Sequence, residues 1–108
     1  MDPEERRVVP VYLLGLDKHR VTRLFVVLLN GRAHDEIERL GGRIVVDLSR
    51  KKKYPTVELN GRERRLHVFV HRLYTGAAPG KGMVIHHENE DKFDNTFENL
   101  SVVSRPVH

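Results

Sequence analysis

The sequence predicts one small α+β domain, with a β-rich N-terminal half followed by a module of strand, loop, strand and helix. Three observations support this class. The chain has 108 residues, of which 39% are hydrophobic, and this is enough for one modest core. Its first half alternates short apolar runs with turn residues. Near its end, a long polar segment (88–98) separates two short apolar runs.

The first half is expected to consist mainly of strands. One of them contains a continuous apolar run from Leu24 to Leu29, which is typical of a strand buried on both faces. The dipeptide Asn30-Gly31 indicates a turn after this strand. The predicted strands of this half are Val8–Leu16, Val21–Leu29 and Arg43–Leu48.

A short helix is predicted between these strands, over Ala33–Leu40. His34 or Asp35 would cap its first turn. Ile37 and Leu40, spaced as i and i+3, would face the core. The helix would therefore cover one face of the neighbouring strands.

The strongest local pattern is a β-hairpin in the middle of the chain. Its expected strands, Tyr54–Leu59 and Arg62–Phe69, flank Asn60-Gly61, a pair that tolerates the positive φ angles of a tight hairpin turn. Apolar and polar residues alternate along both strands, so one face would be apolar and the other basic. A short helix over Val70–Tyr74 is expected to follow.

The last third of the chain is predicted to form the module itself. Its apolar segments are short, and its long polar loop contains two phenylalanines as the only apolar anchors. The expected order is a loop over Gly76–Gly82, a strand over Met83–His87, a loop over Glu88–Glu98, a strand over Leu100–Val103, and a helix that Ser104 caps and Pro106 begins.

Composition excludes several classes of protein. There is no cysteine, which rules out disulfides and thiolate metal sites. No apolar run approaches membrane-spanning length, and Met1–Arg7 lacks the apolar segment of a signal peptide. A soluble cytoplasmic protein with no membrane partner is therefore expected.

Charge is distributed unevenly along the chain, whose formal net charge is +4. A basic middle (50–72) precedes an acidic segment (88–98) that histidines flank. This order suits a surface for a polyanion beside a cation site, although two solvated surfaces of opposite sign would give the same pattern. The basic residues considered for nucleic-acid contact are Lys51, Lys52, Lys53, Arg62, Arg64, Arg65 and Arg72.

Four residues near the C-terminus point to a chemistry: the pair His86-His87, then Asn99, then His108. Adjacent side chains of a strand point to opposite faces, so one histidine could bind a cation while the other acts as a base on water. An asparagine on the second strand could bond the main chain of the loop. A histidine in the final helix could return to the same cation.

This arrangement closely resembles the HNH endonuclease family, with its ββα-metal fold, and in particular its phage-type and AP2-linked members. The resemblance covers about half of the chain and is densest in the C-terminal half. Its spacing is more specific than a histidine pair alone would be. The matching positions are Val70–Leu73, Gly80–Val84, His86-His87, Asp94-Asn95, Asn99-Leu100 and Val102–Ser104.

The resemblance implies a metal-dependent DNA endonuclease that hydrolyses phosphodiester bonds by nicking or double-strand cleavage. His87 matches the general base of the family, and His86 matches its first metal ligand. Asn99 matches the asparagine that fixes the loop and the base, and His108 matches the last ligand. The implied cofactor is one divalent cation, Mg²⁺ or Mn²⁺ in the first place, with Ni²⁺ or Zn²⁺ as alternatives.

The resemblance also implies one HNH domain over 1–108, with an N-terminal β-rich part (1–53) and a hairpin plus module (54–108). The expected partner is DNA, and a phage-encoded protein would act in the host cytoplasm. Beside such a module, the basic residues named above are expected to contact DNA. His71 matches the histidine of the family's His-Arg-Leu segment, and both a structural role and a phosphate contact stay open for it. His67 is interpreted as structural.

The chain departs from the family pattern at three places. Asn89-Glu90-Asp91 stands where relatives often have Asn-Gly-Asp, so the loop could turn differently. Thr96 stands where relatives often have an arginine, which removes one phosphate contact. The chain stops at His108, where the helix of the relatives continues. A non-catalytic nucleic-acid-binding HNH-fold module and an accessory nickase subunit of a phage machine therefore stay as alternative functions.

Overall fold

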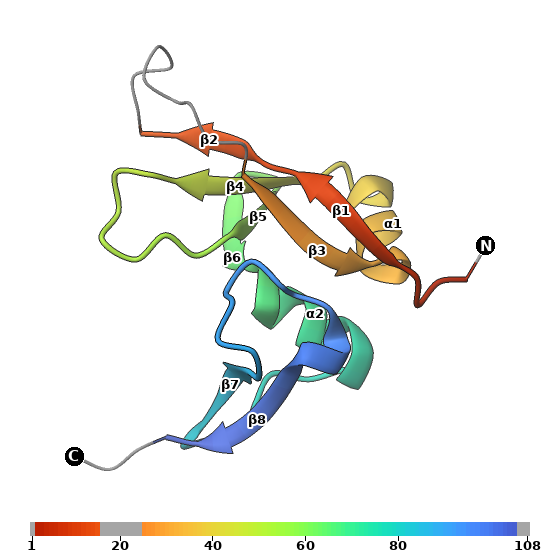
Figure 1. The fold of residues 1–108 in the computed structure, drawn as a ribbon, viewed down its shortest axis with the longest axis vertical. Helices are drawn as coiled ribbons and strands as arrows, with labels where there is room; N and C mark the ends of the chain where they lie inside the picture. The colour runs from red at the N-terminus through yellow and green to blue at the C-terminus, as the bar shows by residue number, and fades with distance from the viewer. Residues whose placement is uncertain (1, 16–24, 106–108) are drawn as a thin grey trace.

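The computed structural model describes residues 2–15 and 25–105. These residues form eight strands, two α-helices and a short 3₁₀ helix, so the α+β class and the β-rich first half are confirmed. Figure 1 shows the N-terminal strands and α1 in one half of the molecule, the C-terminal hairpin in the other, and α2 between them. Within the described residues, no helix is long and apolar enough to cross a membrane.

Two strands occupy the region where one was predicted. Strand β1 (Arg6–Pro10) pairs antiparallel with β3 (Val26–Asn30), whereas β2 (Tyr12–Leu14) joins a different sheet, parallel to β4 (Arg43–Asp47). The single strand predicted over Val8–Leu16 is therefore wrong. The first strand ends at a proline, which has no N–H to continue a ladder. Residue 16, and residues 21–24 of the next predicted strand, lie outside the described residues.

Helix α1 (Gly31–Arg39) begins directly at the end of β3. The turn predicted at Asn30-Gly31 is wrong, because Asn30 ends the strand and immediately precedes the helix. No side chain caps this helix, so the predicted caps are wrong as well. Ile37 is buried as expected, but Leu40 is 41% exposed because the helix has already ended and the chain turns away from the core.

The central hairpin is confirmed. Strands β5 (Thr56–Leu59) and β6 (Arg62–Arg65) pair antiparallel, and the φ angles of Asn60 and Gly61 are 51° and 77°. These positive angles are those that a two-residue hairpin turn requires. With β2 and β4, the hairpin forms a four-stranded sheet in the order β2-β4-β5-β6.

Helix α2 (Leu66–Thr75) replaces the second half of a predicted strand. The strand expected over Arg62–Phe69 stops at Arg65, and the short helix expected over Val70–Tyr74 is longer than predicted. Leu66 and Val70 are fully buried, and this i, i+4 spacing suits one face of a helix as well as one face of a strand. The alternation of apolar residues was therefore ambiguous at this point.

The C-terminal hairpin follows the predicted order. Strand β7 (Met83–His87) pairs antiparallel with β8 (Leu100–Ser104), and His87 lies opposite Leu100. The loop between them ends in a 3₁₀ helix over Phe97–Asn99. Ser104 belongs to β8 instead of capping a helix. The helix predicted to begin at Pro106 lies outside the described residues.

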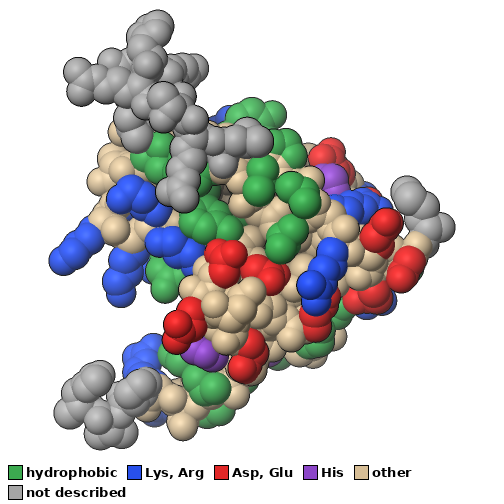
Figure 2. All heavy atoms as spheres, in the orientation of Figure 1, with side chains coloured by type: hydrophobic (Ala, Val, Ile, Leu, Met, Phe, Trp, Pro, Cys, Tyr) green, Lys and Arg blue, Asp and Glu red, His purple; other side chains and the backbone are tan. Residues whose placement is uncertain are grey.

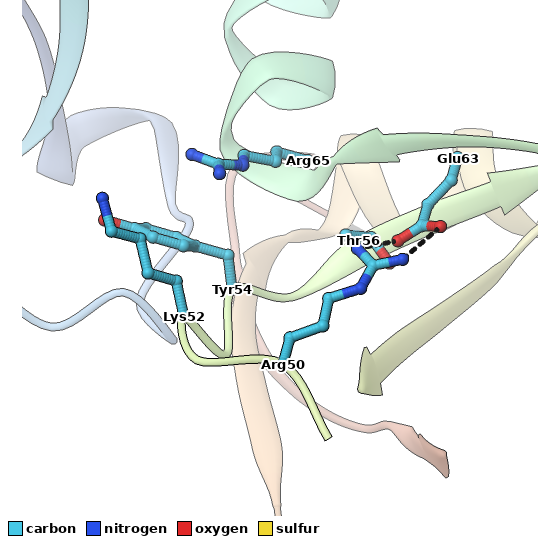
Figure 3. A pocket seen from close by; sticks show the side chains of 6 residues that line it. All are labelled: Arg50, Lys52, Tyr54, Thr56, Glu63 and Arg65. Carbon is cyan, nitrogen blue, oxygen red and sulfur yellow. Dashed lines mark hydrogen bonds and ion pairs between the residues drawn. The ribbon is translucent and has the colours of Figure 1, made fainter. Parts of the chain in front are cut away.

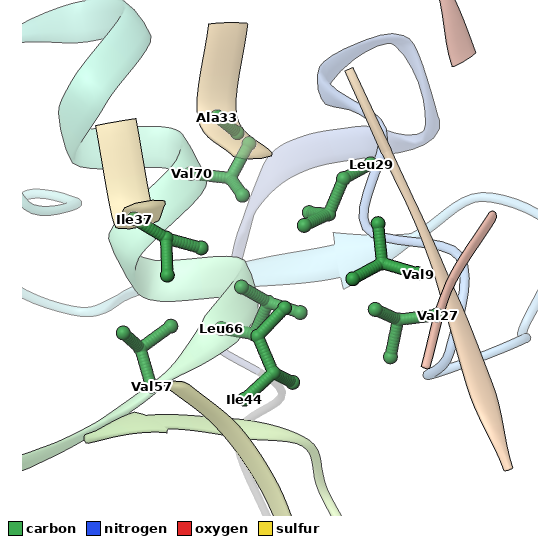
Figure 4. Packing of buried hydrophobic residues seen from close by; sticks show 9 residues of the cluster. All are labelled: Val9, Val27, Leu29, Ala33, Ile37, Ile44, Val57, Leu66 and Val70. Carbon is green, nitrogen blue, oxygen red and sulfur yellow. The ribbon is translucent and has the colours of Figure 1, made fainter. Parts of the chain in front are cut away.

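The core joins the two halves of the molecule. Its buried side chains come from β1, β3, α1, β4, β5 and α2 (Figure 4), so α2 packs on the N-terminal sheets while it also contacts β7. The C-terminal hairpin is thereby attached to a rigid base through α2. The residues of this core are Val9, Val27, Leu29, Ala33, Ile37, Ile44, Val57, Leu66 and Val70.

Candidate active site

The two adjacent histidines of β7 point to opposite faces of the C-terminal hairpin. His86 is exposed, whereas His87 is only 8% exposed. This is the alternation expected of neighbouring residues in a strand. The two imidazoles therefore cannot perform the same task from the same side.

The ring of His87 lies in a defined environment. Its Nε2 atom lies 2.9 Å from Oδ1 of the buried Asn95. The ring of His67 meets it edge to face, with 5.1 Å between the ring centroids. Both histidines line a pocket of about 410 Å³, together with Tyr54 and Arg65. The buried imidazole of His87 thus lies at an open pocket that the positively charged side chain of Arg65 also lines.

Asn99 holds the loop between the strands in its closed shape. Its Oδ1 accepts a hydrogen bond from the main-chain N–H of Asn89 at 3.1 Å. Its Nδ2 donates to the carbonyl oxygen of Asp94 and to Oδ1 of Asn89, both at 2.9 Å. Asn99 is 8% exposed, so these bonds are shielded from water. The contact of an asparagine with the loop main chain agrees with the geometry expected from the sequence, but the amide beside His87 belongs to Asn95.

The loop turns at the position where relatives have a glycine. Glu90 has a φ of 62°, in the left-handed region that glycine adopts most easily. The carboxamide of Asn89 and the carboxylate of Asp91 each accept a main-chain N–H two residues ahead, which stabilises the turn. Thr96 is fully buried, and its hydroxyl donates to the carboxylate of Asp94 at 2.7 Å. The Thr96 side chain therefore forms its hydrogen bond within the loop.

Main-chain hydrogen bonds tie the loop to strand β3. The N–H of Leu28 donates to the carbonyl oxygen of Phe93, and the N–H of Asn95 donates to the carbonyl oxygen of Leu28, both at 2.9 Å. These bonds form a short parallel bridge between segments that are far apart in the sequence. The loop beside His87 is therefore held by the N-terminal half of the protein.

Asn30 adds a second connection from the end of β3. Its Oδ1 accepts the N–H of Phe97 at 2.7 Å, and its Nδ2 donates to the carboxylate of Glu98 at 2.9 Å. Burial acts to raise the pKa of Glu98, but hydrogen bonds from Asn30 and Arg6 outweigh it and hold the pKa below its ordinary value. No sequence motif predicts the hydrogen bonds of Asn30 to the loop, because they join the end of a strand to a loop in the opposite half of the protein.

Strand β6 divides the basic residues between two faces. Arg65 lines a pocket of about 470 Å³ with Lys52 and Tyr54, and Figure 3 shows these three side chains extending in the same direction. Arg62 and Arg64 line a different pocket, as alternation along a strand requires. Only part of the predicted basic set therefore lies on the side of His87.

The connection between β4 and β5 presents the lysine run. Lys51 and Lys52 are exposed, and Lys53 is half-buried. Figure 2 shows Lys and Arg side chains gathered over this connection, at one side of a hollow whose other side is the C-terminal hairpin. Arg50 lines the same pocket as Lys52 and Arg65, but its guanidinium is paired with Glu63 at 2.8 and 3.1 Å (Figure 3). The hollow is therefore basic on one side.

Tyr54 connects the two pockets on this side. The guanidinium carbon of Arg65 lies 4.5 Å from the centroid of its ring, and Nζ of Lys92 lies 5.5 Å from it. Lys92 comes from the loop and Arg65 from β6, so the aromatic ring brings the cations of both halves together. The ring of Tyr54 also lies against the imidazole of His67, with 5.6 Å between the ring centroids.

Helix α2 buries two histidines, of which only one approaches the site. His71 is 9% exposed, whereas Arg72 is exposed. His67 lies beside His87 on a helix, whereas the sequence pattern predicts a strand and a structural role for it. The helical period would have revealed that His67 and His71 share the buried face with Leu66.

His67 is an unusual buried group. It is 8% exposed, and its Nδ1 has no hydrogen-bond partner among the described residues. Burial, followed by the charges of His87 and Arg65, lowers its pKa from 6.5 to about 4. The imidazole is therefore neutral at physiological pH, and it places no charge beside His87.

The predicted cation site is only partly represented in the described residues. His86 offers one exposed imidazole, and the carboxylate of the nearby Glu88 accepts a hydrogen bond from the hydroxyl of Ser101. His108 lies outside the described residues. Across 2–15 and 25–105, no group of three or more His, Asp or Glu side chains is arranged to hold a metal ion. Of the two predicted metal ligands, His86 and His108, the described residues therefore contain His86.

Comparison with known proteins agrees with the geometry of this hairpin. The model of a family described as HNH endonuclease matches residues 64–108, which include α2, β7, the loop and β8. Neither the curated proteins nor the solved structures gave a match. The match thus covers the part of the chain that carries His86-His87 on the first strand and Asn99 before the second, and it makes residues 64–108 similar to the HNH endonuclease family.

Proposed function

We infer nuclease activity in general from the match of residues 64–108 to the HNH endonuclease model. We propose that this protein is a metal-dependent DNA endonuclease in which His87 is the general base. The observation that supports this most directly is the position of His87: buried on β7, bonded to Asn95, and lining a pocket that contains Arg65. A base must be held within reach of its water, and the loop holds this imidazole firmly.

Each residue of the proposed site has one task. His87 takes a proton from the water that attacks the scissile phosphorus. Arg65 and Lys52 bind the phosphate backbone in the adjoining pocket. Asn99 keeps the loop closed around the base. These groups position the substrate and the water before the reaction begins.

A divalent cation is proposed to complete the site. His86 and His108 would hold it, and when bound it supplies charge stabilisation for the phosphorus centre and the leaving 3′ oxygen. Mg²⁺ or Mn²⁺ is proposed as the cofactor, whereas imidazole ligands also suit Ni²⁺ and Zn²⁺.

The proposed functional unit is the whole chain, 1–108. The hydrogen bonds from Leu28 and Asn30 to the loop support this proposal, because they place part of the site under the control of the N-terminal strands. The lysine run (51–53) and Arg65 form the proposed DNA-binding surface on the side of His87. Contacts to phosphate would give affinity with little sequence preference.

Plasmid cleavage tests this function. Supercoiled DNA is incubated with the protein and Mg²⁺, Mn²⁺, Ni²⁺ or Zn²⁺, beside the variants His87→Ala and Asn99→Ala. We expect nicked or linear product with the unmutated protein and a loss of about a hundredfold or more with His87→Ala. Cleavage at an equal rate by His87→Ala would exclude this base. DNA binding without cleavage in any metal would instead identify a non-catalytic HNH-fold module.

A further inference from the structure

We propose that Asn95 is a positioning residue that fixes the tautomer of His87, so that Nδ1 of His87 is its basic nitrogen. The catalytic consequence of this assignment rests on the proposed function. The tautomer itself is a property of the free protein. It can therefore be measured whether or not the protein cleaves DNA.

The orientation of the Asn95 carboxamide follows from its neighbours. Asn95 is fully buried, and its Nδ2 donates to the carbonyl oxygen of Lys92 at 3.0 Å. Reversing the amide would place Oδ1 against that carbonyl oxygen, and two acceptors would face each other in a buried site. The amide is therefore held with Oδ1 directed at His87.

This orientation decides which ring nitrogen of His87 carries hydrogen. An amide oxygen only accepts hydrogen bonds, so Nε2 of His87, at 2.9 Å, is the donor. A neutral imidazole has a single N–H, and Nδ1 therefore keeps its lone pair. Turning the ring over would put a carbon atom beside Oδ1 and leave a buried acceptor without its partner.

Nδ1 of His87 is left to act in the pocket. Within the described part of the chain it has no hydrogen-bond partner, and His87 lines the pocket with His67 and Arg65. In the proposed reaction, Nδ1 takes one proton from water as the water oxygen bonds to phosphorus. The bond from phosphorus to O3′ breaks, and its electron pair leaves with O3′.

Strand β3 determines where Asn95 stands. The main-chain N–H of Asn95 donates to the carbonyl oxygen of Leu28, and the N–H of Leu28 donates to the carbonyl oxygen of Phe93. Main-chain hydrogen bonds to the N-terminal half thus hold Asn95, the residue that orients the proposed base. An asparagine does this without adding the negative charge of a carboxylate partner.

Two-bond ¹H–¹⁵N correlation spectra of the histidine rings test the assignment, at neutral pH and without added metal. For the unmutated protein we expect His87 to be protonated at Nε2, with a slowly exchanging Nε2–H signal. A ring protonated at Nδ1 would overturn the proposal. This measurement needs no variant, so it remains decisive even if a substitution impairs folding.

Variants separate positioning from general damage to the loop. Asn95→Ala should remove the slowly exchanging Nε2–H signal, whereas Asn95→Asp, which keeps an acceptor, should retain it. The matched control is Asn89→Ala, which removes loop hydrogen bonds that do not touch His87 and should leave the signal in place. An unchanged signal in Asn95→Ala would refute the positioning role.

Activity provides the second measurement. Asn95→Ala should lower kcat by about tenfold and leave KM nearly unchanged, because the amide touches the base and not the DNA. If the unmutated protein cleaves no DNA but His87 is protonated at Nε2, the proposed function fails and the tautomer assignment stands. If it cleaves DNA with His87 protonated at Nδ1, only the present inference fails.

Discussion

The buried imidazole of His67 makes the stability of this protein depend on pH. In the folded protein its pKa is lowered from 6.5 to about 4, first by burial and then by the charges of His87 and Arg65. The folded protein therefore binds this proton less readily than the unfolded chain does. Stability is fully present above about pH 6.5 and is lost as the pH falls towards about 4.

The size of the effect follows from linkage. A difference of this size between the pKa values of the folded and unfolded states corresponds to about 3 kcal/mol in total. Between about pH 7.5 and about pH 5, roughly 2 kcal/mol of that amount should disappear. Other groups titrate over the same range, so the contribution of His67 has to be isolated by a variant.

His67→Phe serves this purpose, because phenylalanine keeps a ring of similar shape and cannot be protonated. The free energy of unfolding is measured with urea at both pH values for the two proteins. We expect the unmutated protein to lose about 2 kcal/mol more than His67→Phe when the pH is lowered. The variant should also be at least as stable at neutral pH, because it removes the unpartnered Nδ1.

Two results would refute this reasoning. If both proteins lose the same free energy within about 0.5 kcal/mol, the pKa of His67 is not lowered by its surroundings. If the unmutated protein loses less than the variant, the pKa of His67 is raised, and the folded environment stabilises its charged form instead.

Three further predictions concern the loop and the basic surface. Asn30→Ala should lower the free energy of unfolding by about 3 kcal/mol in urea, because it removes two hydrogen bonds of a fully buried side chain, one of them to a carboxylate, and an unchanged value would contradict the link from β3. Glu90→Gly should raise stability by up to about 1 kcal/mol in thermal melts by relieving the positive φ, and a destabilised variant would show that the turn needs the glutamate. In anisotropy titrations with duplex DNA, Arg65→Ala should reduce the slope of log Kd against log salt by about one, whereas Arg64→Ala, on the other face, should change it much less; equal effects would argue against the proposed surface.

Local patterns predicted the C-terminal hairpin well. The apolar runs that became β7 and β8 are short and bounded by a polar segment, and the pair His86-His87 lies on a strand where the two faces differ in burial. The Asn60-Gly61 turn was equally clear, because few residue pairs tolerate two positive φ angles. Where a few neighbouring residues determine the conformation, the sequence alone was sufficient.

Helix α2 shows where local patterns fail. Leu66 and Val70 fit an alternating strand and a helical stripe equally well, and packing against the core selects the helix. The incorrect strand prediction also gave no reason to place His67 near His87, because His67 contacts His87 from helix α2. The surroundings of the proposed base were therefore less predictable than the base itself.

The anchoring of the loop could not be read from the sequence for a different reason. Leu28 bonds Phe93 and Asn95 through main-chain atoms, which every residue possesses, so no residue type reveals the pairing. Asn30 contributes a side chain, but asparagine at the start of a helix is more often a cap than a partner for a distant loop.

The bridge from Leu28 to the loop means that residues 64–108, the segment matched by the HNH model, depend on a strand outside that segment. Grafting residues 64–108 onto another scaffold would leave the N–H of Asn95 and the carbonyl of Phe93 without the strand that satisfies them. A chimera would need a surrogate strand presenting one residue in extended conformation at that spot. The boundary for engineering this protein therefore lies before β3, far upstream of the segment that carries the histidines.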